Sequence, residues 1–422
     1  GFTHKYYVDA TPAFGDVDFG RTGGTIGTAD WRTILVGGLG KGGRGYYALD
    51  ISTADSSDTE AVIASKVLWE FPNSATTSTA NIGFSYSRPI IVKTKAQGWV
   101  VLVASGYNNG TDTGGDGHGY LFVLNAKTGA LIRALDTGVG TSSSPSGLAQ
   151  ISGYVEDADV DNTVEYVYGG DLNGNLWRFD LTSTSDSGWT VSKVATLVDS
   201  DSGGAVQPIT AAPELAKTRV GSAYKRLVFI GTGQYLGDSD IPGSAAPNAN
   251  AAQRQTMYGL VDDLSGTPIT PLRSNLQPQI LNAPSGSTRT FTNPQPVDLT
   301  NKKGWYIDLN IDGERANTDP SLAFGTLVFT TNIPNVDACT PGGTSWLFAV
   351  DFQSGAYVSN STTVATSQGD ALSSRPVLIK LPDGRVIALV RKSDATTVGQ
   401  QVATPPGSAT TRRISWRELP EG

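Results

Sequence analysis

A strand pair that repeats along the chain constrains the fold more than any other feature. Each copy has an apolar strand that ends at a glycine or polar residue, a turn, and an aromatic-rich strand that ends near Asp or Asn. The first strands are residues 33–38, 100–106, 165–171, 227–233 and 326–331, and the second are residues 45–50, 119–125, 174–180, 255–262 and 344–351. A small sheet cannot bury both faces alone, so such repeats are typical of a β-propeller.

Flanking segments extend this count beyond five units. Residues from Asp9 onward, 374–379 and 385–390 also look like strands, which gives six to eight blades, with seven expected. The aromatic residues of the second strands are expected to pack between neighbouring sheets; they include Tyr47, Phe122, Trp177 and Trp346. We therefore predict an all-β fold, in which residues 1–422 form a single β-propeller domain.

Composition supports this fold and narrows the choice of partner. The 422 residues include 50 Gly and 22 Pro, and only 17% are charged, which argues against long helices or a coiled coil. The net charge of -8 argues against nucleic acid or an anionic membrane surface and favours cations. The sequence contains no run of 18 or more apolar residues, which is the length that a membrane-spanning helix needs. The start lacks an initiator Met and a signal peptide, so we expect a C-terminal fragment of a longer protein.

An acidic segment between two expected strands is the strongest candidate binding site. Asp157, Asp159 and Asp161 occupy positions 1, 3 and 5 of an EF-hand-type loop, Thr163 lies at position 7, where a backbone carbonyl binds, and Glu165 lies at position 9. Carboxylates at this spacing repel one another unless a cation neutralises them. Calcium suits such a flexible oxygen-rich loop better than magnesium, which prefers strict octahedral geometry and retained waters.

Two positions of this loop differ from an EF-hand. Asn162 replaces the usual Gly at position 6, where a positive φ is needed, and Asn tolerates that conformation better than most residues. Tyr168 replaces the bidentate Glu at position 12, and no helix flanks the loop. The sequence therefore predicts a nine-residue calcium loop between strands, closed by Glu165.

Other candidate sites carry weaker signals. The loop 108–118 has acidic residues without regular spacing and is expected to be a connection between blades, although a second ion there stays open. The glycine-rich segment 37–45 lacks the G-K-[ST] ending of a phosphate loop and is expected to form a hairpin. His4 and His118 are expected to be surface residues. Cys339 lacks an activating partner in the sequence, and pairing with a cysteine outside the chain stays open. No nucleophile motif is present, so no enzyme activity is expected.

The combined motifs resemble the C-terminal domain of the PilC/PilY family of type IV pilus tip-associated adhesins. The resemblance rests on residues 31–50, 83–89, 106–109, 342–347 and 412–419, together with the acidic loop running into 168–180. It implies a modified seven-bladed propeller related to quinoprotein dehydrogenases, in which calcium at Asp157, Asp159, Asp161, Thr163 and Glu165 regulates pilus extension against retraction. Glu165 stands where the family often has Asp.

The resemblance also implies a location and partners. It implies an extracellular protein at the pilus tip or outer membrane, which contacts major or minor pilins and supports pilus biogenesis, attachment to host or abiotic surfaces, twitching motility and virulence. Two alternatives stay open: a quinone-dependent dehydrogenase, and a carbohydrate-binding propeller of unknown ligand. Quinone-dependent dehydrogenases of this type have a characteristic pair of adjacent cysteines. This chain cannot supply that pair, because it has a single cysteine.

Overall fold

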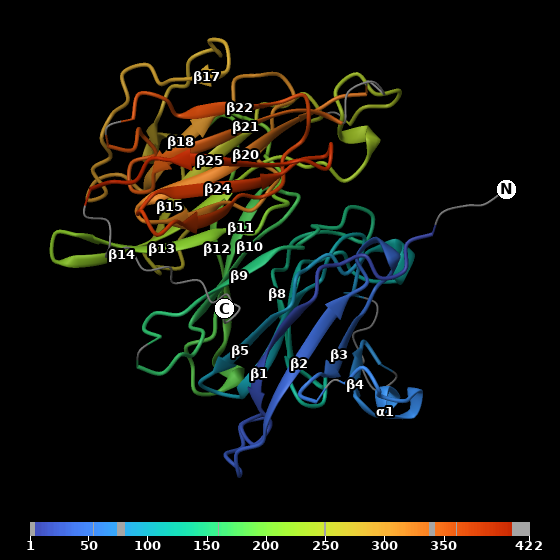
Figure 1. Ribbon diagram of the computed structural model, residues 1–422. Helices are drawn as coiled ribbons and strands as arrows, with labels where there is room; N and C mark the ends of the chain where they lie inside the picture. Colours follow the sequence, from blue (N-terminus) through green and yellow to red (C-terminus); the bar gives the residue numbers. More distant parts are fainter. Residues whose placement is uncertain are drawn as a thin grey trace. The chain divides into compact units, whose positions relative to one another are not determined.

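Short apolar strands separated by turns fold into small sheets in the computed structural model. The structure describes residues 5–53, 55–73, 81–158, 160–248, 250–336, 342–359 and 361–406. Among them, one compact unit comprises 5–171 and 177–192, and a second comprises 172–176 and 193–406. The described residues form six sheets (Figure 1).

The first three sheets each have four strands. The first has the order β1-β2-β3-β4, with β1 (Ala13–Asp18), β2 (Trp31–Gly38), β3 (Tyr46–Asp50) and β4 (Val67–Phe71). The second has the order β5-β6-β7-β8, with β5 (Ile90–Thr94), β6 (Gly98–Ala104), β7 (Tyr120–Asn125) and β8 (Leu131–Asp136). The third has the order β12-β11-β10-β9, with β9 (Ile151–Tyr154), β10 (Tyr166–Gly170), β11 (Asn175–Asp180) and β12 (Thr190–Thr196).

The remaining sheets have five, five and three strands. The order β13-β14-β15-β18-β16 joins β13 (Glu214–Val220), β14 (Ala223–Gly231), β15 (Thr256–Asp262), β18 (Gly304–Asp308) and β16 (Gln277–Pro278). The order β17-β22-β21-β20-β19 joins β17 (Thr288–Arg289), β22 (Ala365–Gly369), β21 (Gly343–Asp351), β20 (Thr326–Pro334) and β19 (Ser321–Ala323). The last is β23-β24-β25, with β23 (Val377–Lys380), β24 (Val386–Arg391) and β25 (Thr397–Val402).

Helices are short and few among these residues. The α-helix α1 (Glu60–Ser65) precedes β4, and Thr59 caps it by accepting a hydrogen bond from Val62 N. The 3-10 turns are η1 (Gly40–Gly42), η3 (Thr111–Thr113), η4 (Asp186–Gly188), η5 (Asp238–Asp240) and η6 (Arg273–Asn275). In the described part of the chain, no helix is long and apolar enough to cross a membrane.

The repeated strand pairs predicted from the sequence are confirmed as antiparallel neighbours. They are β2 with β3, β6 with β7, β10 with β11, β14 with β15, and β20 with β21. The six sheets of the described residues are one fewer than the seven blades expected. The segment after Asp9 does not begin a sheet of its own, because β1 pairs with β2 in the first sheet, with Ala13 opposite Val36.

Consecutive sheets bury their apolar faces against each other within each unit. In the first unit, one core joins β1–β4 to β5–β8 and another lies between β5–β8 and residues of β10 and β11. In the second unit, a core joins the sheets of β15 and β21, and a smaller one joins β20 and β21 to β24. Phe122, Trp177 and Trp346 are buried, and Tyr47 is half-buried. This face-to-face packing buries the apolar faces that a single sheet would leave exposed to water.

Trp305 is the largest fully buried side chain of the second unit's core. It lies on β18 opposite Gly259 of β15, and its Nε1 donates to Phe352 O at 3.1 Å. A Cβ atom at Gly259 would lie 2.4 Å from Trp305 Cε2. The glycine therefore provides the space in which the indole lies.

Candidate metal centre

The acidic loop connects two strands of one sheet. It follows β9 and ends at Glu165, directly before β10, as the sequence predicts. Glu165 N donates to Tyr154 O at 2.9 Å, and Val164 N donates to Lys93 O at 2.8 Å. Thr163 also forms a parallel bridge with Lys93 of β5. The C-terminal half of the loop is thus fixed by its own sheet and by a strand of the neighbouring sheet.

The N-terminal half of the loop curls on itself. Asp157 O accepts hydrogen bonds from Val160 N at 3.1 Å and Asp161 N at 3.4 Å. Asn162 then adopts a φ of 50°. A left-handed residue at this position confirms the prediction made for position 6, because Asn tolerates this conformation better than most residues with a side chain.

Asp161 turns the chain back toward β10. Its Oδ1 accepts hydrogen bonds from Thr163 N at 3.0 Å and Thr163 Oγ1 at 2.9 Å. The backbone hydrogen bond from Thr163 lowers the pKa of Asp161 because it stabilises the charged form. Its other oxygen, Oδ2, faces a lysine.

Glu165 carries a carboxylate that is largely withdrawn from water. The residue is 7% exposed, and its Oε2 accepts a hydrogen bond from Glu156 N at 2.7 Å. Burial raises the pKa of Glu165 above its usual value. A buried carboxylate needs a positive charge beside it, because desolvation disfavours the anion.

One positive charge lies beside both carboxylates. Lys95 Nζ is 3.3 Å from Glu165 Oε1 and 3.7 Å from Asp161 Oδ2. Two of the predicted ligands therefore converge on the same cationic group. Carboxylate oxygens are the donors that calcium prefers, so these side chains fit that ion chemically.

The full ligand set stays a prediction. Asp159 lies outside the described residues. In the part of the chain that the structure describes, no group of three or more His, Cys, Asp or Glu side chains has the arrangement of a metal site. Sequence reasoning also missed Lys95. No local motif marks it, because β5 pairs with the loop only in the folded sheet.

The other sequence candidates have structural roles or lie outside the described residues. The loop 108–118 joins β6 and β7 of one sheet, so the expected connection between blades is wrong. In that loop, His118 Nδ1 lies 3.1 Å from Asp136 Oδ1, and Asp116 accepts hydrogen bonds from Tyr120, Asn81 and His118. The segment 37–45 forms the expected hairpin between β2 and β3. His4 and Cys339 lie outside the described residues.

Comparison with known proteins identifies relatives over most of the chain. A family model described as the PilY1 beta-propeller domain matches residues 1–293. A type IV pilus biogenesis factor PilY1 homolog of Xylella fastidiosa is 32% identical over 377 residues, which are 84% of this chain and 23% of that protein. The type IV pilus biogenesis factor PilY1 of Pseudomonas aeruginosa PAO1 is 29% identical over 409 residues, 87% of this chain and 32% of that protein.

A solved structure supports the fold independently. The C-terminal domain of Pseudomonas aeruginosa PilY1 matches with a TM-score of 0.68 and 24% identity, covering 92% of this chain and 83% of that chain. The chain spans about a quarter to a third of the two curated relatives described above.

Proposed function

The chain belongs to the PilY1 β-propeller family, and we propose that it is a calcium-binding, non-enzymatic module of type IV pilus biogenesis. The ligands would be carboxylates of Asp157, Asp159, Asp161 and Glu165 with the backbone carbonyl of Thr163. We retain the prediction that residues 1–422 are one propeller domain.

The convergence of Asp161 and Glu165 on Lys95 Nζ carries the calcium proposal. Glu165 is buried, so its carboxylate depends on a nearby cation, and Asp161 adds a second negative charge to the same place. Asn162 supplies the left-handed turn that the loop needs. A hard divalent ion would supply positive charge that orders a loop of mutually repelling carboxylates.

The role in pilus biology follows from the family and from calcium together. The relatives are named as type IV pilus biogenesis factors. We propose that calcium occupancy biases how the domain docks on major or minor pilins, and thereby the balance of pilus extension and retraction. The location would be extracellular, at the pilus tip or outer membrane, where the whole protein would also support surface attachment, twitching motility and virulence.

Calorimetric titration of the chelator-stripped chain with calcium tests the metal site, with magnesium as the competing ion. We expect calcium to bind saturably. Asp157→Ala should lower the calcium affinity at least tenfold. Asp238→Ala is the matched control, because Asp238 is exposed on η5 and outside the loop. Unchanged calcium binding in Asp157→Ala would refute the ligand assignment, and failure of that variant to fold would make the ion structural instead of regulatory.

A genetic experiment tests the pilus role separately. The full-length protein carrying Asp157→Ala, expressed in a host deleted for the native gene, should alter the amount of surface pili and reduce twitching. If a variant that no longer binds calcium still has normal pili and twitching, calcium does not regulate the pili. The metal site itself would then still stand.

A further inference from the structure

The second unit contains a cavity of about 460 Å³ lined mainly by polar side chains. The polar lining comprises Asp199, Ser200, Arg254, Asn310 and Asp312. Arg254 precedes β15 and Asn310 follows β18, and these strands pair antiparallel, so both residues emerge at the same end of one sheet. Leu309 N donates to Gln255 O at 2.9 Å and continues that pairing to the cavity. Cavities of about 300–1,000 Å³ hold small ligands.

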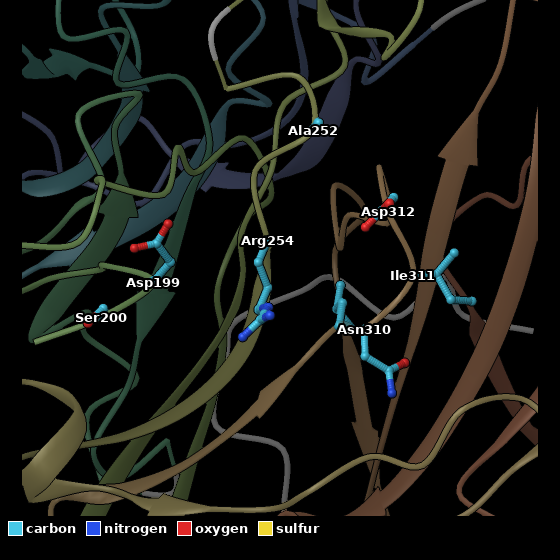
Figure 2. A pocket seen from close by; sticks show the side chains of 8 residues that line it. Asp199, Ser200, Ala252, Arg254, Asn310, Ile311 and Asp312 are labelled. Atoms are coloured by element: carbon cyan, nitrogen blue, oxygen red, sulfur yellow. The ribbon is translucent and has the colours of Figure 1, made fainter.

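Opposite charges line the cavity without neutralising each other. Among the described residues, the Arg254 guanidinium and the Asp312 carboxylate have no hydrogen-bonding or ionic partner. Within the same described residues, the Asp199 carboxylate accepts one side-chain hydrogen bond, from Gln253 Nε2 at 3.2 Å. In the view of Figure 2, the Arg254 side chain lies between those of Asp199 and Asp312. A ligand can therefore offer an anion to Arg254 and hydrogen-bond donors to the two carboxylates.

Buried arginines hold the wall that carries Asn310 and Asp312. Arg315 donates to Ala251 O at 3.1 Å and to Gly313 O at 3.0 Å, and it thereby joins the two chain segments that bear Arg254 and Asp312. Arg289 donates to Asn310 Oδ1 and fixes that amide. Both arginines are buried.

The turn that carries Asp312 is closed by a backbone bond. Glu314 N donates to Ile311 O at 3.0 Å, and Gly313 adopts a φ of 75°, which a residue with a side chain rarely takes. Asp312 is thus held at the tip of a defined turn.

A third arginine holds the opposite wall. Arg273 Nε donates to Val198 O at 2.7 Å, next to Asp199, while its other nitrogens pair with Asp308 at 2.9 Å. Asp199 is therefore tied to the end of β18 that also leads to Asn310. These bonds fix the backbone of both walls, whereas the Arg254 and Asp312 side chains, which have no such bonds within the described part of the chain, are exposed.

We propose that this cavity binds an acidic sugar, a pyranose ring that carries a carboxylate. The planar guanidinium of Arg254 matches a ligand carboxylate with two parallel hydrogen bonds. The carboxylates of Asp199 and Asp312 provide acceptors for vicinal hydroxyls, and the Asn310 amide, already bonded to Arg289 and to Leu281 O, lines the wall beside them. Ile311 gives the C–H face of the ring an apolar contact.

Titration of the calcium-loaded chain with D-galacturonate, followed by ligand-detected NMR, tests this proposal. We expect saturable binding with a dissociation constant on the order of 1 mM, in line with ligand efficiencies of small molecules. Arg254→Gln should weaken binding at least tenfold, and Asp312→Asn should weaken it several-fold. Arg219→Gln is the matched control, an exposed arginine at the end of β13 that does not line the cavity.

Two further ligands decide the chemical class. Neutral D-galactose should bind more weakly than galacturonate and respond little to Arg254→Gln; equal affinity for both sugars would overturn the acidic assignment. L-glutamate should not displace bound galacturonate. If glutamate binds more tightly than galacturonate, the ligand class is an amino acid and the sugar assignment is wrong. No saturable galacturonate binding would overturn the site. The cavity shares no residue with the acidic loop, so Asp157→Ala should keep sugar binding, which separates this test from that of calcium.

Discussion

Lys95 Nζ lies 3.3 Å from Glu165 Oε1, so a lysine in the turn after β5 neutralises a buried carboxylate beside the next sheet. The same ammonium reaches Asp161 Oδ2 at 3.7 Å. In the proposed calcium site, Lys95 and the metal ion would compete for the same oxygens. An ammonium and a divalent ion about 4 Å apart repel by about 2 kcal/mol in water without salt, and dissolved ions screen part of this repulsion. Lys95 thus limits the calcium affinity although it is no ligand itself.

Replacing this lysine should therefore tighten calcium binding. We expect Lys95→Met to lower the calcium dissociation constant about fivefold, which corresponds to about 1 kcal/mol of relieved repulsion. Calorimetry measures the change. Lys127→Met serves as the control, because Lys127 is exposed on the turn after β7 and lies outside the loop. Equal or weaker binding in Lys95→Met would contradict competition at this position.

Local pattern was sufficient to predict the strand pairs and the turn at Asn162. Alternating apolar and aromatic residues specify strands, and adjacent strands joined by a short turn pair with each other, as β2 and β3 do. The number of sheets was harder to predict. The segment after Asp9 could begin a new sheet or complete the first one, and only its pairing with β2 decides between them.

Contacts between distant segments could not be predicted. Lys95 reaches Glu165 because Lys93 bridges to Thr163, and nothing in either segment alone encodes that register. The cavity at Arg254 likewise needs three segments, from near residues 199, 254 and 311, that meet only after the sheet of β15 has formed. No motif marks those residues in the sequence.

A buried ion pair should make the second unit sensitive to loss of one charge. Arg289 Nη1 lies 2.7 Å from Glu314 Oε1, and both side chains are 0% exposed. Arg289→Met would leave Glu314 in the interior without its cation, and we expect a loss of about 3–5 kcal/mol in the free energy of unfolding. Urea denaturation of the whole chain measures the loss.

The pH dependence of that variant checks the cause. Burial raises the pKa of Glu314. Without Arg289, the folded state would bind a proton more tightly than the unfolded state, so the deficit of Arg289→Met should shrink as the pH falls to about 4. The double variant Arg289→Met/Glu314→Gln should be more stable at neutral pH than Arg289→Met. A deficit independent of pH would point to lost packing instead of an unpaired charge.

Acid should remove stability that the salt bridge of Asp263 provides. Lys303 Nζ lies 2.7 Å from Asp263 Oδ2, and this hydrogen bond holds the pKa of Asp263 well below its usual range. Because the folded pKa is below the unfolded one, the contribution is complete above about pH 4 and is lost as the pH falls further. Asp263 is 38% exposed, so Asp263→Asn should cost only about 0.5 kcal/mol at pH 7 and distinctly less near pH 2. Denaturant titrations at both pH values test it, with Asp238→Asn expected to be neutral at each. An equal loss at both pH values would exclude the charge as its origin.

The space beside Trp305 should tolerate no added atom at Gly259. A Cβ there would lie 2.4 Å from Trp305 Cε2, closer than any normal contact. The indole cannot move away easily, because its Nε1 is bonded to Phe352 O and a Cβ at Gly355 would likewise lie 2.4 Å from Trp305 Cδ2. We expect Gly259→Ala to lower the free energy of unfolding by about 1–3 kcal/mol, the usual cost of overpacking a core. Gly237→Ala is the control, since that glycine has a φ of -169° and open space around its Cβ position. Thermal denaturation followed by tryptophan fluorescence compares the two, and equal stability would show that the sheet shifts to admit the methyl group.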